Sequence, residues 1–349
     1  MDHSFEMGGR TIGEGSPCFL IAEAGVNHNG ELDAALRLVD VASSAGCDAV
    51  KFQTFRARDL VTREAPRARY QVHNTGSRAS QHALLADLEL PYDDFATLKE
   101  HCDAQGILFL STPHTEDALS FLDPLVPGFK ISSGDLTHLP LLRRAASLGK
   151  PLILSTGMAT LEEVQQALKC IREQANPPVM VLHCTTSYPC LPEEVHLDAM
   201  LTMAEELDCP VGYSDHTVGM QVAIMAVTLG AVCIEKHFTL DRTQPGPDHA
   251  ASLTPEELKE LVQALRRVPN IRGRSDKAPT ETEQEMRDTI RKSLVAAQEI
   301  PAGTVIVREM LAVKRPGNGI EPAMLEQVAG RRAKVRIPED ALIRWDQVE

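Results

Sequence analysis

The chain has 349 residues, and its 35 Lys and Arg against 49 Asp and Glu give a formal net charge of −14. Its 43% hydrophobic and 24% charged residues are typical of a globular protein with a large core, and the absence of basic runs argues against a nucleic-acid partner. No apolar run approaches the roughly 18 residues of a membrane span, and the start, MDHSFEMGGR, lacks the regions of a signal peptide, so we expect a cytoplasmic protein without a membrane partner.

Eight short apolar segments with strand-like composition alternate with helical patterns along most of the chain. The segments are 19–25, 49–54, 107–112, 128–134, 151–157, 179–184, 211–216 and 231–238. Between them, apolar residues recur at helical spacing, and Thr160 with Glu163 forms the sequence pattern of a capping box. An open doubly wound sheet would usually carry a glycine-rich phosphate turn, and neither GxGxxG nor GxxxxGK[ST] occurs. The pattern therefore predicts an α/β protein with a closed (β/α)8 TIM barrel.

The segments outside these eight units suggest a second domain. Before the first strand, GGRTIGEGSP is typical of a hairpin that closes the bottom of the barrel. The segment 271–288 is polar and charged, and we interpret it as a linker between a barrel over 1–270 and a compact β-rich domain over 289–349. The eight cysteines are scattered singly, which is typical of reduced thiols.

Polar side chains occupy the end of every predicted strand. They are Glu23; Lys51 and Gln53; Ser111 and Thr112; Lys130 and Ser133; Ser155 and Thr156; His183 and Thr185; Ser214, Asp215 and His216; and Glu235 and His237. In a parallel barrel these ends meet at one rim, where catalytic groups lie. A solvated strand end explains any single position, but the whole set favours an active site.

Two lysines lie within apolar strands. An ammonium group buried without a partner loses hydration worth several kcal/mol, so Lys51 and Lys130 indicate a bound phosphate or carboxylate. Ser and Thr hydroxyls at the same rim would add hydrogen-bond donors. The alternative is that each lysine pairs with a neighbouring Asp or Glu.

Two histidines end consecutive strands. Because neighbouring strands lie about 4.8 Å apart, His216 and His237 can converge on one cation. The oxygen-rich surroundings favour Mn²⁺ or Mg²⁺ in an open site that polarises a substrate carbonyl. The alternative is a pair of core histidines bonded to carboxylates.

The motifs together resemble the sialic acid synthases. The matching runs are IAEAGVNHNG (21–30), VKFQTF (50–55), STP (111–113), KISSGD (130–135), LSTGMAT (154–160), LHCTTSYP (182–189), SDHT (214–217), EKHFTLD (235–241), GPDHAAS (246–252) and KRPGNGI (314–320). The resemblance implies a metal-dependent condensation of phosphoenolpyruvate with N-acetylmannosamine, which yields N-acetylneuraminate and phosphate. It also implies a barrel followed by a small antifreeze-like SAF domain, in a domain-swapped homodimer.

The resemblance assigns roles to residues of this chain. It implies that phosphoenolpyruvate is bound by Lys51, Thr112, Lys130, Ser133, Ser155 and Ser214, and the metal by His216 and His237. It implies that the sugar is held by Glu23, Asn74, Tyr188, Asp248 and, from the other copy of the chain, Arg315. Glu23, Asp135, His216 and His237 are the implied catalytic residues.

The chain departs from the family pattern at two places. Asp135 stands where many relatives have Glu, a candidate for handling the water that attacks C2, and the turn CTTSYP has Thr185 and Thr186 where many have Asn. Three other functions fit parts of the pattern: a synthase of legionaminic or pseudaminic acid that uses a 2,4-diacetamido-2,4,6-trideoxyhexose, a metal-dependent aldolase that uses pyruvate, and a binding protein with an inactive barrel.

Overall fold

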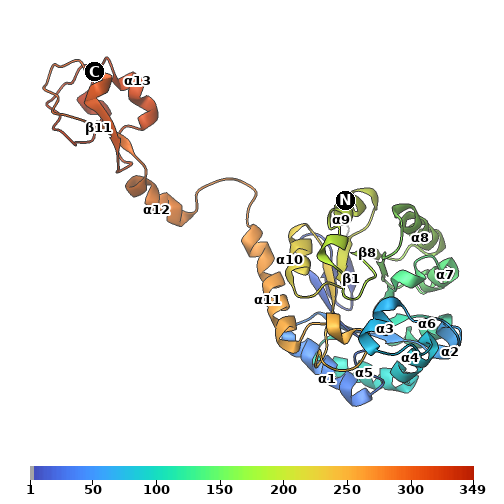
Figure 1. The fold of residues 1–349 in the computed structure, drawn as a ribbon. Coiled ribbons are helices and arrows are strands. Elements are labelled where there is room, and N and C mark those ends of the chain that lie inside the picture. Colours follow the sequence, from blue (N-terminus) through green and yellow to red (C-terminus); the bar gives the residue numbers. More distant parts are fainter. Residues whose placement is uncertain (1–3) are drawn as a thin grey trace. The chain divides into compact units, whose positions relative to one another are not determined.

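The computed structural model describes residues 4–349, which form two compact units. The boundary between the units along the chain lies between Gly273 and Arg274. The first unit contains eight parallel strands, each followed by helix (Figure 1). The strands are β3 (Phe19–Gly25), β4 (Ala49–Thr54), β5 (Leu108–Pro113), β6 (Phe129–Ile131), β7 (Leu152–Ser155), β8 (Val179–Cys184), β9 (Val211–Asp215) and β10 (Cys233–His237). Seven of the predicted segments contain their strand in full, and the segment 107–112 covers all of β5 except Pro113.

The strands form a nearly closed barrel. Hydrogen bonds connect them in the order β5-β4-β3-β10-β9-β8-β7-β6, and the two outer strands of this order, β5 and β6, pack beside each other. The predicted (β/α)8 barrel is confirmed. Since residues in register on parallel neighbours point to the same side, the pairing of His237 with Glu23 and of Glu23 with Lys51 brings these three side chains together.

Helices cover the outside of the barrel. They are α1 (Leu32–Ala45), α6 (Glu116–Leu122), α7 (Leu139–Ser147), α8 (Leu161–Gln174), α9 (Asp198–Glu206), α10 (Gln221–Thr228) and α11 (Pro255–Arg272). The capping box at the start of α8 is confirmed, because the Thr160 hydroxyl accepts from the Glu163 amide and the Glu163 carboxylate accepts from the Thr160 amide. Each helix buries an apolar stripe, such as Val164, Leu168 and Ile171 of α8, against the sheet.

The connection from β4 to β5 is longer than the others. It contains α2 (Ala57–Leu60), α3 (Arg69–Thr75), α4 (Gln81–Leu88) and α5 (Tyr92–Gln105). Of these, α5 covers the barrel through Phe95 and Leu98, whereas Leu84 and Leu88 of α4 form a separate apolar cluster with Val26 and Phe55. The extra helices therefore build one wall above the strand ends.

The hairpin of β1 (Phe5–Met7) and β2 (Arg10–Ile12) closes the lower end of the barrel. Met7 and Ile12 are buried against Phe19, Ile21 and other residues near the starts of the strands. This is the position predicted for a hairpin. The strands begin a few residues earlier than the glycine-rich segment suggested.

The second unit has a small core of its own. Antiparallel β11 (Ser293–Ala296) and β12 (Leu311–Lys314), isolated bridges and α13 (Leu325–Val328) surround it. Its buried residues are Leu294, Ala296, Ile300, Ile306, Ile320, Val328, Ala333, Ile337, Ile343 and Val348. The segment interpreted as a linker contains the end of α11 and most of α12 (Glu281–Ile290), a helix with no buried residue.

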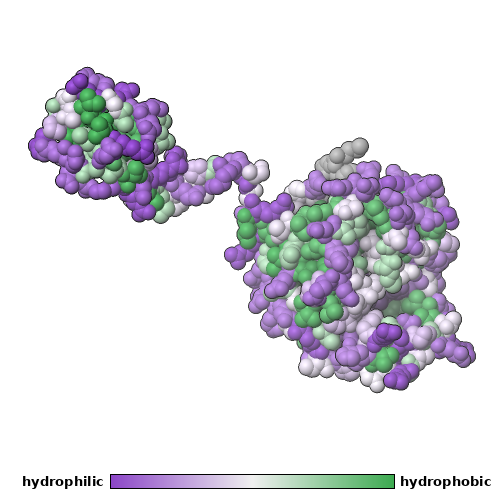
Figure 2. All heavy atoms as spheres, turned by 45° about the horizontal axis from the view of Figure 1, so that its top comes forward, coloured by the Kyte–Doolittle hydropathy of each residue, from purple (hydrophilic) through white to green (hydrophobic). Residues whose placement is uncertain are grey.

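All eight cysteines are buried and unpaired. Within residues 4–349, no helix combines the length and the apolar character needed to cross a membrane. The visible face of both units is mostly hydrophilic, with scattered hydrophobic residues (Figure 2).

Candidate active site

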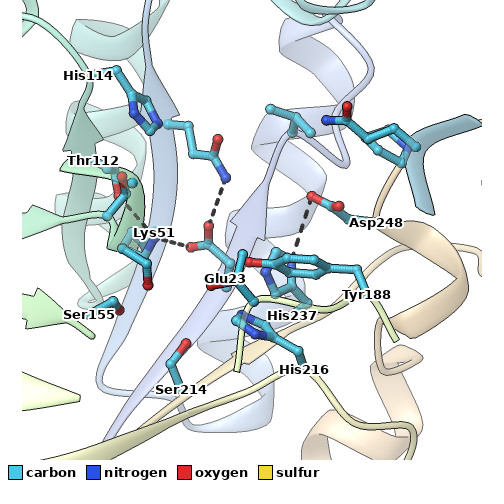
Figure 3. Close-up of a pocket in the computed structure, with 18 of the residues that line it drawn as sticks. Glu23, Lys51, Thr112, His114, Ser155, Tyr188, Ser214, His216, His237 and Asp248 are labelled. Carbon is cyan, nitrogen blue, oxygen red and sulfur yellow. Dashed lines mark hydrogen bonds and ion pairs between the residues drawn. The ribbon is translucent and has the colours of Figure 1, made fainter. Parts of the chain in front are cut away.

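A cavity of about 330 Å³ lies at the carboxyl ends of the barrel strands. Residues from the strands or from the loops that follow them line it (Figure 3). The predicted site residues that line it are Glu23, Lys51, Thr112, Lys130, Ser133, Ser155, Tyr188, Ser214, His216, His237 and Asp248. Residues scattered over 226 positions of the sequence therefore meet in one chamber because alternate side chains at each strand end point inward.

Two lysines and two glutamates form the buried floor of the cavity. The Lys51 ammonium lies 2.7 Å from Glu23 Oε2 and 3.7 Å from Glu235 Oε2. The Lys130 ammonium lies 3.5 Å from Glu235 Oε1. Each lysine thus pairs with a glutamate, as the alternative interpretation of the sequence stated. All four groups nevertheless line the cavity, where a ligand can reach them.

Burial and mutual attraction oppose each other in this group of charges. Burial raises the pKa of Glu23 to about 7, although Lys51 works against it. Burial also lowers the pKa of Lys130. For Lys51 and Glu235 burial disfavours the charged form, but the opposite charges outweigh it, so the pKa of Lys51 is raised and that of Glu235 is lowered. Glu23 is therefore the group of the four that exchanges a proton near neutral pH.

Hydroxyl groups complete the floor. Thr112 Oγ1 accepts from the Lys51 ammonium at 3.1 Å, and Ser155 Oγ accepts from the Lys130 ammonium at 2.6 Å. Ser214 Oγ donates to Glu235 Oε1 at 3.0 Å. Ser111, which the sequence analysis also placed at the rim, instead exchanges a 2.7 Å hydrogen bond with Thr54. Lysines and hydroxyls of this kind suit the binding of carboxylate and phosphate oxygens.

The two histidines lie next to each other, with ring centroids 5.5 Å apart. Burial lowers the pKa of His216 to about 4 and that of His237 well below its ordinary value, so both imidazoles are neutral at pH 7. His216 Nδ1 donates to the Thr185 carbonyl at 2.7 Å, which leaves its Nε2 as a lone-pair donor. His237 Nδ1 is buried and has no hydrogen-bond partner among residues 4–349. Neutral imidazole is the form that binds divalent cations, but within residues 4–349 no three His, Cys, Asp or Glu side chains are arranged to hold a metal ion, so these two histidines would form an open, two-ligand site.

Aromatic and acidic side chains, among them Tyr188 and Asp248, lie on the side of the cavity away from Lys51 (Figure 3). The Tyr188 ring packs on His216 with centroids 4.2 Å apart and on Tyr70 with centroids 4.9 Å apart. Asp248 Oδ2 lies 4.0 Å from His237 Nδ1, and burial raises the pKa of Asp248 to about 6. This side offers stacking surfaces and hydrogen-bond acceptors, the groups that sugars need.

Three predicted residues do not line the cavity. Asn74, on α3, donates to the Pro247 carbonyl at 2.6 Å and so fixes the loop that carries Asp248. The Asp135 carboxylate accepts from the Ser132 hydroxyl at 2.7 Å and lies 3.2 Å from His114 Nδ1. Arg315 belongs to the second unit and follows β12, and its role at the sugar stays a prediction.

Several lining residues were missed by the sequence analysis. Glu235 was noted as a strand end but given no role, although its position two residues before His237 predicts that both face inward. No motif marks the wall from the β4 to β5 connection, which contributes Tyr70, Gln71, Gln81, Leu84, Leu85 and Leu88. His114 also lines the cavity, and so does Thr186, which the sequence had marked as a departure from the family pattern.

Comparisons with known proteins cover most of the chain. A family model described as the NeuB family matches residues 38–277, and one described as a SAF domain matches residues 291–349. N,N'-diacetyllegionaminic acid synthase of Legionella pneumophila is 42% identical over 97% of this chain and 96% of its own length. Human N-acetylneuraminate-9-phosphate synthase is 36% identical over 98% and 95%.

A solved structure extends the likeness to three dimensions. The N-acetylneuraminic acid synthetase of Leptospira borgpetersenii, in complex with citrate, has a TM-score of 0.72 and 35% identity over 82% of this chain and 95% of that one. Identity at this level over most of the chain goes with a common fold and descent. The chain therefore belongs to the NeuB family of enzymes and ends in a SAF domain, as its motifs indicated.

Proposed function

We propose that this enzyme condenses phosphoenolpyruvate with an N-acetylated amino sugar in its open-chain form. C3 of phosphoenolpyruvate bonds to the aldehyde carbon, water adds to C2, and phosphate leaves. With N-acetylmannosamine the product is N-acetylneuraminate. The observation that supports the proposal is that two buried ammonium groups and two imidazoles line the same cavity of about 330 Å³.

The lysine side of the cavity is the site for phosphoenolpyruvate. Lys51 and Lys130 are each 3% exposed, so an anion that reaches them is bound with little competition from water. Glu235 partly neutralises both lysines in the free enzyme, while the raised pKa of Glu23 lets this carboxyl carry a proton and so weakens its repulsion of the anion. The same ammonium groups stabilise the charge on the departing phosphate.

The imidazole side of the cavity is the site of the aldehyde. A divalent cation such as Mn²⁺ or Mg²⁺ held by His216 and His237 would polarise the sugar carbonyl. Tyr188 and Asp248 lie beside these histidines and would orient the sugar hydroxyls. Glu23, whose Cα is in register with that of His237, can give its proton to the former aldehyde oxygen.

An apolar wall of the cavity favours a second candidate for the acceptor sugar. The cavity wall that includes Val26, Leu84, Leu85 and Leu88 is apolar. A 2,4-diacetamido-2,4,6-trideoxyhexose carries two acetyl methyl groups and a methyl in place of a hydroxymethyl, so it gains more from such a wall than N-acetylmannosamine does. The Legionella pneumophila relative named for diacetyllegionaminic acid is 42% identical, against 36% for the human relative.

A phosphate-release assay with a panel of acceptors tests the proposal. The purified enzyme is supplied with Mn²⁺, phosphoenolpyruvate and one of three acceptors: N-acetylmannosamine, the diacetamido sugar or mannose. We expect phosphate and a nonulosonic acid in equal amounts with an acetamido sugar, and almost none with mannose. The variant His237→Ala should lose the metal-dependent turnover. Product formation from pyruvate without phosphate release would instead establish an aldolase.

A further inference from the structure

His114 and Asp135, beside the phosphoenolpyruvate side of the cavity, form a pair that has no part in the proposed function described above. We infer that His114, oriented by Asp135, is the base that takes a proton from the water that attacks C2 of phosphoenolpyruvate. This inference rests on the proposed function. In this inference Asp135 positions His114, and His114, not Asp135, deprotonates the water.

The fold fixes the imidazole from two sides. His114 follows β5, and Asp135 ends the short 3-10 turn Ser133–Asp135 after β6, the strand that packs beside β5. The His114 Nδ1 lies 3.2 Å from Asp135 Oδ2, which also accepts from the Ser132 hydroxyl at 2.7 Å. The Phe55 ring meets the imidazole edge to face, with centroids 6.1 Å apart.

These contacts decide which nitrogen is free. Burial works to raise the pKa of Asp135, but the hydrogen bonds from His114 and Ser132 outweigh it and lower that pKa, so the carboxylate stays ionised and accepts the Nδ1 proton. In the neutral form of the imidazole the Nε2 atom then carries a lone pair. Within residues 4–349 it has no hydrogen-bond partner, and His114 lines the cavity. A carboxylate behind a neutral imidazole is the arrangement that makes histidine a general base.

The pair lies on the side of the cavity where the water is needed. Figure 3 shows His114 near Thr112 and Lys51, away from Tyr188 and Asp248. The two floor carboxylates are already engaged, Glu23 by Lys51 and Gln53 and Glu235 by Ser214 and both lysines. Among the described residues, His114 thus offers on this side an accepting nitrogen that has neither a hydrogen bond nor an ion pair.

The proton transfers balance. As C3 bonds to the aldehyde carbon, C2 loses electron density, the water oxygen bonds to C2, and one water proton passes to His114 Nε2. The new C2 hydroxyl then gives its proton to the phosphate as the bond from C2 to the phosphate oxygen breaks and the C2 carbonyl forms. The imidazolium returns its proton to solvent, and Glu23, having protonated the sugar oxygen, takes one up.

Substitutions of both partners test the inference. We expect His114→Gln, which keeps a polar side chain without a base, to lower kcat by about 100-fold or more while KM for phosphoenolpyruvate changes less than about threefold. Asp135→Asn should also lower kcat, because an amide that donates to Nδ1 moves the proton to Nε2. Asp135→Glu should retain more activity than Asp135→Asn. The double variant His114→Gln, Asp135→Asn should be no slower than His114→Gln alone.

A matched pair on the surface serves as the control. His101 Nε2 lies 2.7 Å from Asp40 Oδ1, outside the cavity, and His101→Gln should leave kcat and KM unchanged. Circular dichroism and Tm, compared across the variants, show whether each is folded. A folded His114→Gln enzyme with kcat within threefold of the unsubstituted enzyme would overturn the inference, and so would losses that multiply in the double variant.

A measurement without substrate separates this inference from the proposed function. Nitrogen-15 NMR of labelled histidine, assigned by comparison with His114→Gln, reports which ring nitrogen carries the proton at pH 7. We expect the proton on Nδ1 in the unsubstituted enzyme and on Nε2 in Asp135→Asn. A proton on Nε2 in the unsubstituted enzyme rules out His114 as the base. If the tautomer is as expected but no sugar supports phosphate release, the proposed function fails and the role of His114 at C2 fails with it.

Discussion

The most unusual residues of this chain are the charged ones inside the barrel. Two lysines and two glutamates, each less than 5% exposed, share one floor. Hydrophobic residues of similar volume would often give equal or greater stability than buried ion pairs. The charges therefore serve the ligand more than the fold. Glu235 has two roles. It stabilises both ammonium groups in the free enzyme, and it accepts the hydrogen bond that holds Ser214 in place.

At this scale we predict that Lys130→Met raises KM for phosphoenolpyruvate by roughly 100-fold, which corresponds to about 3 kcal/mol for a lost charge-assisted contact. Methionine keeps the length and volume of the side chain. The control is Lys236→Met, because Lys236 is also buried but pairs with Asp215 at 2.8 Å and does not line the cavity. This control should lower Tm with little change in KM. An unchanged KM in Lys130→Met, measured by phosphate release, would contradict the binding role of the lysine.

The sequence predicted which residues line the cavity where a polar group ends a strand. Lys51, Lys130, His216 and His237 face the cavity as expected, because strand alternation and the shared rim leave few other places for them. Asp135 could not be placed in this way. It lies in a turn, and the direction of its side chain depends on contacts with His114 and Ser132. No strand or helix periodicity in the sequence predicts these contacts.

At the scale of elements, the turn after β7 lies close to the two neighbouring loops at Gly157. A Cβ atom on Gly157 would lie 2.1 Å from Thr186 Oγ1 and 3.0 Å from both Cys184 Sγ and Ser133 Oγ. The Gly157 amide also donates to Ser133 Oγ at 3.0 Å. The glycine thus allows the loops after β6, β7 and β8 to meet at the edge of the cavity.

We therefore predict that Gly157→Ala displaces Thr186 or Ser133 and lowers stability by about 1–3 kcal/mol, with a larger loss in kcat/KM for phosphoenolpyruvate than the stability change explains. Gly134→Ala is the matched control in the same region, because the nearest atom to its added Cβ is Ser132 Oγ at 3.7 Å. Tm and steady-state kinetics of both variants check this. Equal effects of the two substitutions would show that close packing at Gly157 is not required.

The elements differed in how well the sequence predicted them. The eight strands and the helix caps follow from local composition, since apolar runs and the Thr160 capping box act over a few residues. The connection of residues 55–107 was not predicted. Its helices α2 to α4 are short and, except for α4, bury little, so their apolar residues show no clear period, and Leu84 and Leu88 find their partners Val26 and Phe55 only in the folded chain.

At the scale of the whole molecule, an enzyme with a net charge of −14 is proposed to bind an anion. Surface charges beyond the Debye length, about 8 Å at physiological salt, are largely screened. Lys51 and Lys130 act at contact distance in a buried cavity, where the effective dielectric constant is lower. The charges of these two lysines therefore determine whether the anion binds. The acidic surface favours solubility.

The two units are proposed to act together across a domain-swapped dimer, in which Arg315 of one chain serves the barrel of the other. A mixing experiment tests this. Neither Lys130→Met nor Arg315→Ala alone should turn over acetamido sugars well, but equal amounts of the two, unfolded and refolded together, should recover about a quarter of the unsubstituted activity. Half of the dimers are then mixed, and one of the two sites in each combines an intact barrel with an intact arginine. No recovery, although mass spectrometry detects mixed dimers, would show that Arg315 serves its own chain or neither.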